Sequence, residues 1–423
     1  PSTAPPSYGP VPWPRPGLDN LIMDGHLPYS QRNTAIDMLR ALTLCLMIFV
    51  NDLWTIHGVP HWMEHAGTME DFLGLADFVY PAFLFAMGMS IPYSIENRIR
   101  KGGEAGSALL HILKRGFSLV LMGVFMVNEG EGLNIGPHSE ELYPLIMVAG
   151  FFLLWNDYGG AKPVLRTLLR LLGAAILIWM TVRFRTPDGR MMQARWWGIL
   201  GLIGWAYMAC AILYLMARDR LEVHIPAWVF FIALCLLFTS TRGGEPLLDL
   251  GRGNFLDSLR NTLHFGNGSD QTLAMGGMIL SIVSARYASG WKPTRRVLAG
   301  LCAAAILVAL GFVSHHWFIA SKNLATLPWV LWSSALSVIV YTCLQILVRH
   351  GITGWFKPLS PAGTSTLTAY MVPEFPIGFC GLTGLNLWGR FSGLTGVLYI
   401  ICYVALVLAI TWLLGKLHIK LKL

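Results

Sequence analysis

The sequence predicts an all-α membrane protein: a polytopic transmembrane helical bundle of about 10–12 spans, with both termini in the cytoplasm. The first observation is composition. Mean hydropathy is +0.55, and 54% of residues are hydrophobic while only 13% are charged, where soluble domains carry about 25% charged residues. The second observation is that apolar stretches of about twenty residues recur along the chain. The third is that Lys and Arg are concentrated in alternate loops.

The first 33 residues are expected to form a flexible cytoplasmic tail. They begin PSTAPPSYGPVPWPRPG, which is rich in proline and lacks the basic-then-apolar pattern of a cleaved signal peptide. Residues 34–423 are then expected to form one transmembrane domain, because they leave no room for a further large domain.

Apolar stretches predict about twelve spans. Two of these segments are unusual: 141–155 is short, and 361–379 contains Pro361, Pro373, Glu374 and Pro376. The predicted spans are 36–56, 71–95, 107–127, 141–155, 164–182, 196–217, 224–240, 270–289, 296–316, 325–348, 361–379 and 391–415.

The distribution of positive charge predicts the orientation of the bundle. If the loop with Arg98, Arg100 and Lys101 is cytoplasmic, alternation places most other basic loops and the basic C-terminus on that side. Loop 57–70 has no Lys or Arg and is expected to face outward. Loop 183–195 is an exception, because its four arginines fall on the outer side. A miscounted span, an anionic ligand, or arginines reaching the interface would each explain it.

Charge and cysteine content exclude some classes of function. The net charge of +8 serves first to orient a membrane protein, so no nucleic-acid partner is expected. The seven cysteines are scattered, without a CxxC pair, and are interpreted as small core residues rather than as disulfides or metal ligands.

Polar and titratable residues gather at the outer end of the first span and in the loop after it. Asn51 and Asp52 precede His57, His61 and His65. Three histidines at spacings of four could bind a metal on a helix, but Gly58 and Pro60 make a regular helix doubtful. A proton relay in a transporter and acid–base or covalent catalysis by histidine remain as alternatives. The residues alone do not decide between them.

Several ordered segments carry a family resemblance. The strings IDMLRALTLCLMIFVND, EHAG and LADFVYPAFLFAMGMSI, followed later by SKNLATLPW and PLSPAGTSTLTAYMVPE, resemble the heparan-α-glucosaminide N-acetyltransferase family, in its bacterial branch of transmembrane acyltransferases. The resemblance extends from residue 36 to about residue 380. Departures include Ala41 and Thr364, where the family usually has Gly and Asn, and the segment ELYPLIMVAG.

The resemblance implies an enzyme. The family's catalytic histidine corresponds to His65, its active-site asparagine to Asn51, and Asp77 would orient the histidine. The implied reaction is acetyl transfer from cytoplasmic acetyl-CoA to the amine of a glucosamine-type sugar on the far side, by an integral protein of a bacterial inner membrane. A homodimer is also implied, and no metal is expected.

The chemistry of this reaction suggests binding residues. The phosphates of CoA require cations, for which Arg40, Lys114 and Arg115 are candidates, together with Lys322. The positive-inside rule explains the positions of Arg40, Lys114 and Arg115 equally well. The acceptor is assigned to Asp52, Tyr370 and Glu374. His65 could act as a base or carry the acetyl group as an acyl-imidazole. The alternative function is a secondary transporter of amino sugars or cell-wall fragments, although no internal repeat is evident. A membrane scaffold would leave the polar set unexplained.

Overall fold

The computed structural model describes residues 29, 33–130, 132–133, 135–136, 138–196, 198–249, 263–385 and 391–423. The predicted N-terminal tail, 1–33, lies outside the described residues apart from Tyr29 and Asn33. In the described part of the chain, the regular elements are all helices, as the sequence predicts.

The helices follow one another along the whole described chain. They are α2 (Thr34–Leu53), η1 (His61–Met63), α3 (Leu75–Arg100), α4 (Ala105–Val127), α5 (Ser139–Trp155), α6 (Pro163–Arg183), α7 (Ile199–Ala217), α8 (Leu221–Phe238), α10 (Ser269–Ile282), η2 (Val283–Tyr287), α11 (Pro293–His315), α12 (Leu327–Arg349), η3 (Gly354–Leu359), α13 (Ser360–Thr364), α14 (Thr366–Met371), α15 (Glu374–Thr383) and α16 (Gly393–Lys416).

Nine helices of the described residues are long and apolar enough to cross a membrane: α2, α3, α4, α6, α7, α8, α11, α12 and α16. The chain is therefore a multi-pass integral membrane protein. Two further predicted spans correspond to shorter helices. The span 141–155 is α5, with 17 residues, and the span 270–289 is the 14-residue α10 continued by the π-helical turn η2.

The predicted span 361–379 differs from the structure. It is divided among α13, α14 and α15, with interruptions at Ser365 and at residues 372–373. Proline has no backbone N–H, so Pro373 cannot donate the next hydrogen bond of the helix, which explains a break at this position. The C-cap conformation of Ser365, with φ −131° and ψ 44°, separates α13 from α14. This segment is therefore not one straight helix.

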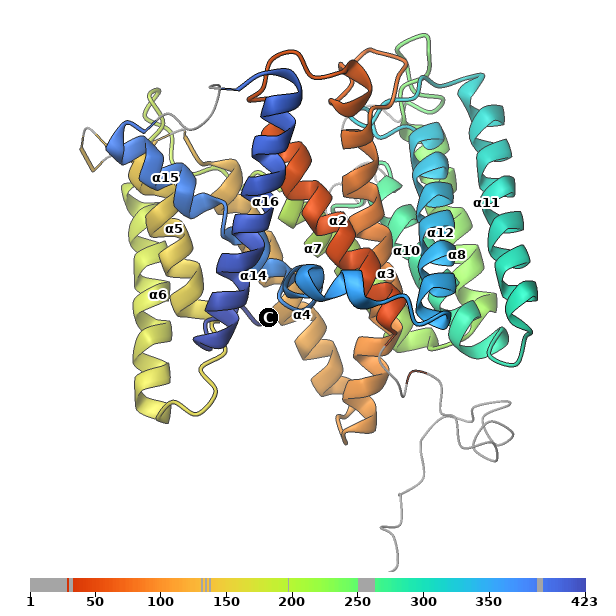
Figure 1. Ribbon diagram of the computed structural model, residues 1–423, viewed down its shortest axis with the longest axis horizontal. Coiled ribbons are helices and arrows are strands. Elements are labelled where there is room, and N and C mark those ends of the chain that lie inside the picture. Colours follow the sequence, from red (N-terminus) through yellow and green to blue (C-terminus); the bar gives the residue numbers. More distant parts are fainter. Residues whose placement is uncertain are drawn as a thin grey trace, which may run out of the picture.

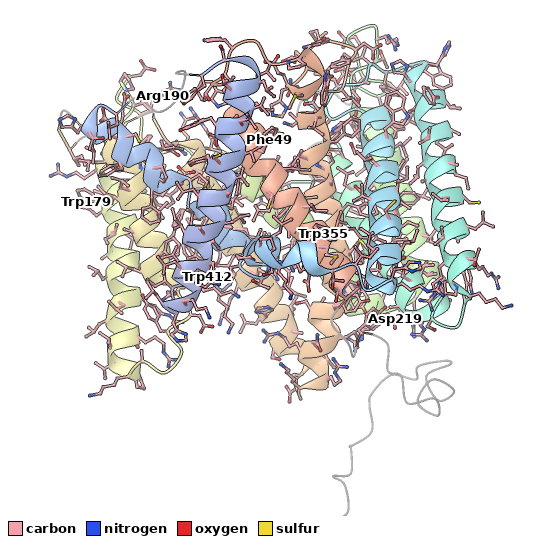
Figure 2. All side chains as sticks on the ribbon, viewed as in Figure 1. Phe49, Trp179, Arg190, Asp219, Trp355 and Trp412 are labelled. Carbon is pink, nitrogen blue, oxygen red and sulfur yellow. The ribbon has the colours of Figure 1, made fainter. Side chains whose placement is uncertain are left out.

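The long helices run roughly side by side, and their connections alternate between two ends of the bundle (Figure 1). The loop between α2 and α3 is at one end, with the arginine-containing loop between α6 and α7, whereas Asp219 is at the other (Figure 2). A miscounted span therefore does not explain the arginines. Arg190 pairs with Asp188 at 2.9 Å, and Arg185 donates to the carbonyls of Val182 and Phe184.

The interior of the bundle is formed by α2, α3, α7, α10 and α12. Asn33 begins α2, where its side chain accepts hydrogen bonds from the backbone of Ala35 and Ile36, as N-cap residues do. Helices α3 and α10 approach closely because α3 has a glycine at the contact: a Cβ on Gly88 would lie 1.8 Å from the carbonyl oxygen of Ala274. Helices α6, α8 and α11 lie at the periphery, each with 17% of its most apolar window buried.

Candidate active site

The loop between α2 and α3 carries the histidines. Its only helical turn is η1, His61–Met63, so the regular helix that a histidine metal face would need does not form. His61 instead pairs with Glu70, with Nε2 of His61 2.7 Å from Oε1 of Glu70. Among the described residues, no group of three or more His, Cys, Asp or Glu side chains is placed to hold a metal ion.

His65 and Asp77 form a hydrogen-bonded pair. Nδ1 of His65 lies 2.8 Å from Oδ1 of Asp77. The other oxygen, Oδ2, accepts the backbone N–H groups of Ala66 at 3.0 Å and Gly74 at 3.1 Å. Because a carboxylate only accepts hydrogen bonds, Nδ1 of His65 carries the proton, and Nε2 is left as the basic nitrogen. The Asp77 side chain is 2% exposed while that of His65 is 41% exposed, so a fixed carboxylate orients an accessible imidazole.

The start of α3 explains why Asp77 is held so firmly. Gly74 is the N-cap of α3, and Asp77 occupies the third helical position, from which its carboxylate reaches back to the Gly74 N–H. A Cβ on Gly74 would lie 1.9 Å from the carbonyl oxygen of Glu64, so only glycine allows the loop to pass this closely. From α12, Trp329 donates its indole N–H to the backbone oxygen of Asp77 at 2.8 Å.

Lys322 completes this cluster. Its Nζ lies 3.3 Å from Nδ1 of His65, and burial lowers its pKa, although the charge of Asp77 opposes this shift. The turn between α11 and α12, which carries Lys322, is attached to the histidine loop: Ser321 donates to the carbonyl of Thr68 at 3.1 Å. The structure thus places Lys322, which the sequence analysis assigned to the CoA site, beside the imidazole.

A second contact fixes the same two loops at their edge. Asp71 accepts hydrogen bonds from the backbone N–H of Ala320 at 2.7 Å, from His315 at 2.8 Å and from Arg242 at 2.7 Å. Burial acts to raise the pKa of Asp71, but these three donors hold it below its usual range. The loops at this end of the bundle are thus connected through one carboxylate.

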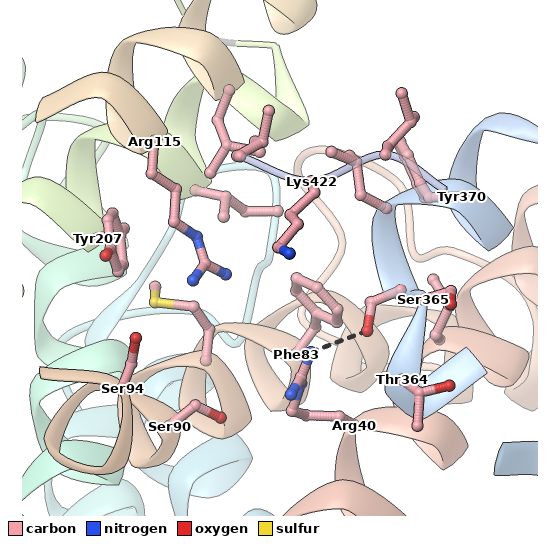
Figure 3. A pocket seen from close by; sticks show the side chains of 18 of the residues that line it. Arg40, Phe83, Ser90, Ser94, Arg115, Tyr207, Thr364, Ser365, Tyr370 and Lys422 are labelled. Carbon is pink, nitrogen blue, oxygen red and sulfur yellow. Dashed lines mark hydrogen bonds between the residues drawn. The ribbon is translucent and has the colours of Figure 1, made fainter. Parts of the chain in front are cut away.

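An elongated cavity of about 530 Å³ follows α2 from the end of the bundle opposite these loops. Its lining along α2 runs from Asn33 to Met47, about 21 Å at 1.5 Å per residue. Arg40, Arg115 and Lys422 point their nitrogen atoms into this space (Figure 3). Arg40 donates to the hydroxyl of Thr366 at 2.9 Å, and the guanidinium of Arg115 lies 4.9 Å from the ring centroid of Tyr207. We name this space the basic cavity.

The predicted phosphate-binding residues separate here into two groups. Arg40 and Arg115 line the basic cavity, whereas Lys114 is exposed and is not among the lining residues. The sequence analysis did not anticipate Lys420 and Lys422, which also line it. They reach it because the C-terminal segment folds back onto the bundle, where the Leu421 N–H donates to Thr368 at 3.0 Å.

A second cavity, of about 410 Å³, lies farther along α2. It contains Asn51, Asp52 and Glu374, and Tyr370 borders it as well as the basic cavity. We name it the acidic cavity. Burial raises the pKa of Glu374, and the neighbouring carboxyl of Glu129, which shares a hydrogen bond with it, raises it further. Such a pair holds a proton between two carboxyl groups.

The three residues predicted for catalysis therefore lie in two places. Asn51 is in the acidic cavity with Asp52. His65 is in the loop between α2 and α3, hydrogen-bonded to Asp77 in the first turn of α3. His65 lines neither the basic nor the acidic cavity. Asn51 is exposed, and it follows Met47 of the basic cavity by one helical turn, about 6 Å.

Comparison with known proteins finds similarity over the segment that carries these residues. Residues 32–128 match the family described as heparan-alpha-glucosaminide N-acetyltransferase, catalytic. The mouse (Mus musculus) heparan-alpha-glucosaminide N-acetyltransferase is 35% identical over 106 residues, which cover 24% of this chain and 15% of that protein. The human (Homo sapiens) protein is 35% identical over 98 residues, covering 23% and 14%. The match thus spans about one seventh of each relative's length. The resemblance inferred from the sequence is confirmed over this segment, which contains Asn51, His65 and Asp77.

Proposed function

We propose that this chain is a transmembrane N-acetyltransferase that transfers the acetyl group of acetyl-CoA to the amine of a glucosamine-type sugar. The observation that carries the proposal is the His65–Asp77 pair. It combines a buried carboxylate, a fixed tautomer and an accessible imidazole, and it lies inside the segment that resembles the catalytic region of known N-acetyltransferases.

In the proposed reaction, His65 acts as the base. The sugar amine attacks the thioester carbonyl, its proton passes to Nε2 of His65, and the C–S bond breaks as the C–N bond forms, releasing CoA as its thiol after protonation. Asp77 keeps Nδ1 protonated and stabilises the imidazolium. In the other route, Nε2 attacks first and carries the acetyl group, splitting the transfer into two steps. Asn51 is proposed to donate a hydrogen bond to the developing oxyanion, which is worth about 3 kcal/mol.

The basic cavity is the proposed donor site. It is long, and its part near the end of the bundle opposite the histidine loop is basic. Its inner part, farther along α2, is formed by apolar side chains such as Leu44, Met47 and Phe83. The phosphates of CoA would bind Arg40, Arg115 and the C-terminal lysines, and the thioester end would extend along α2 toward Tyr370. Phe83 is six residues from Asp77 on α3, which places this inner end about 9 Å along the helix from the catalytic pair.

The acidic cavity is the proposed acceptor site. An amino sugar arrives as an ammonium ion. Asp52, together with the single negative charge of the proton-sharing Glu374–Glu129 pair, provides the negative charge that attracts it. The positive-inside rule supports an orientation with the basic cavity and both termini in the cytoplasm and His65 on the far side. A bacterial inner membrane would fit this arrangement.

The test is thiol release by purified protein in detergent, given acetyl-CoA and glucosamine. Wild-type protein is expected to release CoA thiol in proportion to N-acetylglucosamine. His65→Ala is expected to abolish the reaction, and His61→Ala, on the same loop and also paired with a carboxylate, is the matched control. Glucosamine uptake into vesicles without thiol release would overturn the proposal in favour of a transporter.

A further inference from the structure

A third cavity, of about 240 Å³, lies among α3, α8, α10, α11 and α12. The proposed reaction does not use it. Most of its wall is apolar, with Phe85, Trp228, Leu280, Leu307 and Val338 among the lining side chains. Such a wall favours a hydrocarbon ligand over a polar one, because few of its groups can form hydrogen bonds.

Two of the helices around this cavity, α8 and α11, belong to the periphery of the bundle. In α8 and α11 only 17% of the most apolar window is buried, so both helices present most of their surface to the surrounding lipid. The cavity is bounded on one side by α11, through Ala299, Ala303 and Leu307. A lipid chain can therefore reach it from the bilayer without crossing the protein interior.

A π-helical turn shapes the wall on the α10 side. The α-helix α10 ends at Ile282 and continues as η2, Val283–Tyr287, and Val283 and Ser284 line the cavity. A π-turn inserts an extra residue into the helix and often marks a functional site. This irregular turn therefore forms part of the cavity wall.

One end of the cavity is cationic. Arg296 lines it and donates through Nη2 to the carbonyl of Ser289, but its Nε is buried and, among the described residues, has no hydrogen-bond partner. Trp291 also lines the cavity, and the guanidinium of Arg295 lies 4.1 Å from its ring centroid. A buried donor without an acceptor costs free energy, which an anionic oxygen at this position would recover.

We propose that this cavity binds an anionic phospholipid, with one acyl chain among α8, α10, α11 and α12 and the phosphate at Arg296. Charge complementarity selects this occupant: basic pockets between transmembrane helices bind anionic head groups, and the apolar wall continues from Arg296 toward Phe85. The loop between α10 and α11 lies at the end of the bundle opposite the histidine loop (Figure 1), so the lipid would come from the leaflet on that side.

The experiment is native mass spectrometry of purified, delipidated protein after titration with phosphatidylglycerol or phosphatidylcholine. Wild-type protein is expected to retain one phosphatidylglycerol at least fivefold more often than phosphatidylcholine. Arg296→Gln is expected to remove this preference, and Lys292→Gln, at the exposed N-cap of the same helix, is the control for a lost charge.

A second pair of variants tests the apolar part. Ala303→Phe fills the cavity and is expected to reduce retention of either lipid at least fivefold, whereas Ala305→Phe, on the exposed face of α11, should leave it unchanged. Equal retention of phosphatidylglycerol by wild type, Arg296→Gln and Ala303→Phe would overturn the proposal. A wild-type protein that retains phosphatidylglycerol and phosphatidylcholine equally would also overturn it. The Arg296→Gln result stands even if Ala303→Phe does not fold.

Discussion

Replacement of Asp77 by asparagine tests the role assigned to the His65–Asp77 pair. Oδ2 of Asp77 accepts two backbone N–H groups, from Ala66 and Gly74, while Oδ1 faces His65. In Asp77→Asn, the single amide oxygen would keep both backbone hydrogen bonds, which leaves the NH₂ group facing Nδ1 of His65. Nδ1 must then accept a hydrogen bond from this NH₂ group, so the imidazole proton moves to Nε2. Nε2 can no longer act as the base.

The magnitude follows from this change of tautomer. The same substitution in the Ser-His-Asp triad lowers kcat about 10⁴-fold with the geometry intact, so we expect kcat to fall about 10³–10⁴-fold, or roughly 4–5 kcal/mol. Because the backbone hydrogen bonds remain, the free energy of unfolding should change by only about 1–2 kcal/mol. The KM for acetyl-CoA should stay near its wild-type value, since Asp77 does not line the basic cavity.

The assay is thiol release with acetyl-CoA and glucosamine, together with thermal unfolding in detergent. Glu70→Gln is the matched control, because Glu70 also accepts from a histidine of this loop and from a backbone N–H, Gly67, at 2.7 and 2.8 Å. This control should retain activity within about twofold, as expected for an exposed pair. An Asp77→Asn protein that keeps more than a tenth of wild-type kcat would refute the reasoning.

Three further outcomes are expected. Arg115→Gln should raise the KM for acetyl-CoA about tenfold with kcat nearly unchanged, and Lys114→Gln should change neither, as initial-rate kinetics will show. The pKa of Asp71 is lowered in the folded protein, so its ionised form contributes about 1 kcal/mol to the free energy of unfolding. This contribution is complete above the unfolded pKa of about 3.9 and is lost as the pH falls through the folded pKa. The difference in melting temperature between wild type and Asp71→Asn should therefore shrink in acid, and a difference that stays constant with pH would contradict this. Gly88→Ala should cost about 3 kcal/mol or more, because its Cβ would lie 1.8 Å from a backbone oxygen of α10, whereas Gly106→Ala, with open space at its Cβ, should leave the melting temperature unchanged.

The sequence predicts the long helices well because their signal is local. Apolar stretches such as 36–56 and 325–348 correspond to α2 and α12, and hydrophobicity over twenty residues is sufficient to identify them. The contact between His65 and Asp77 is also short in sequence, since the two residues are 12 positions apart. The family resemblance predicts that both belong to the catalytic site.

Other features depend on long-range contacts that carry no periodic signal. Lys322 reaches His65 from 257 positions away, and Lys420 and Lys422 line the basic cavity only because the C-terminus folds back onto the bundle. As isolated residues, Lys420 and Lys422 look like ordinary positive-inside anchors. The division of 361–379 into short helices could be suspected from its prolines, but the position of each break required the structure.

Tyr370, where the basic and acidic cavities meet, has a consequence for the cell that would contain this protein. If an acetyl group crosses the bilayer here, the opening must not let ions through, because a continuous aqueous pore would dissipate the proton gradient across that membrane. A partly buried phenol ring that lines both cavities would interrupt such a water column. Chemical transfer could then proceed without electrical conductance.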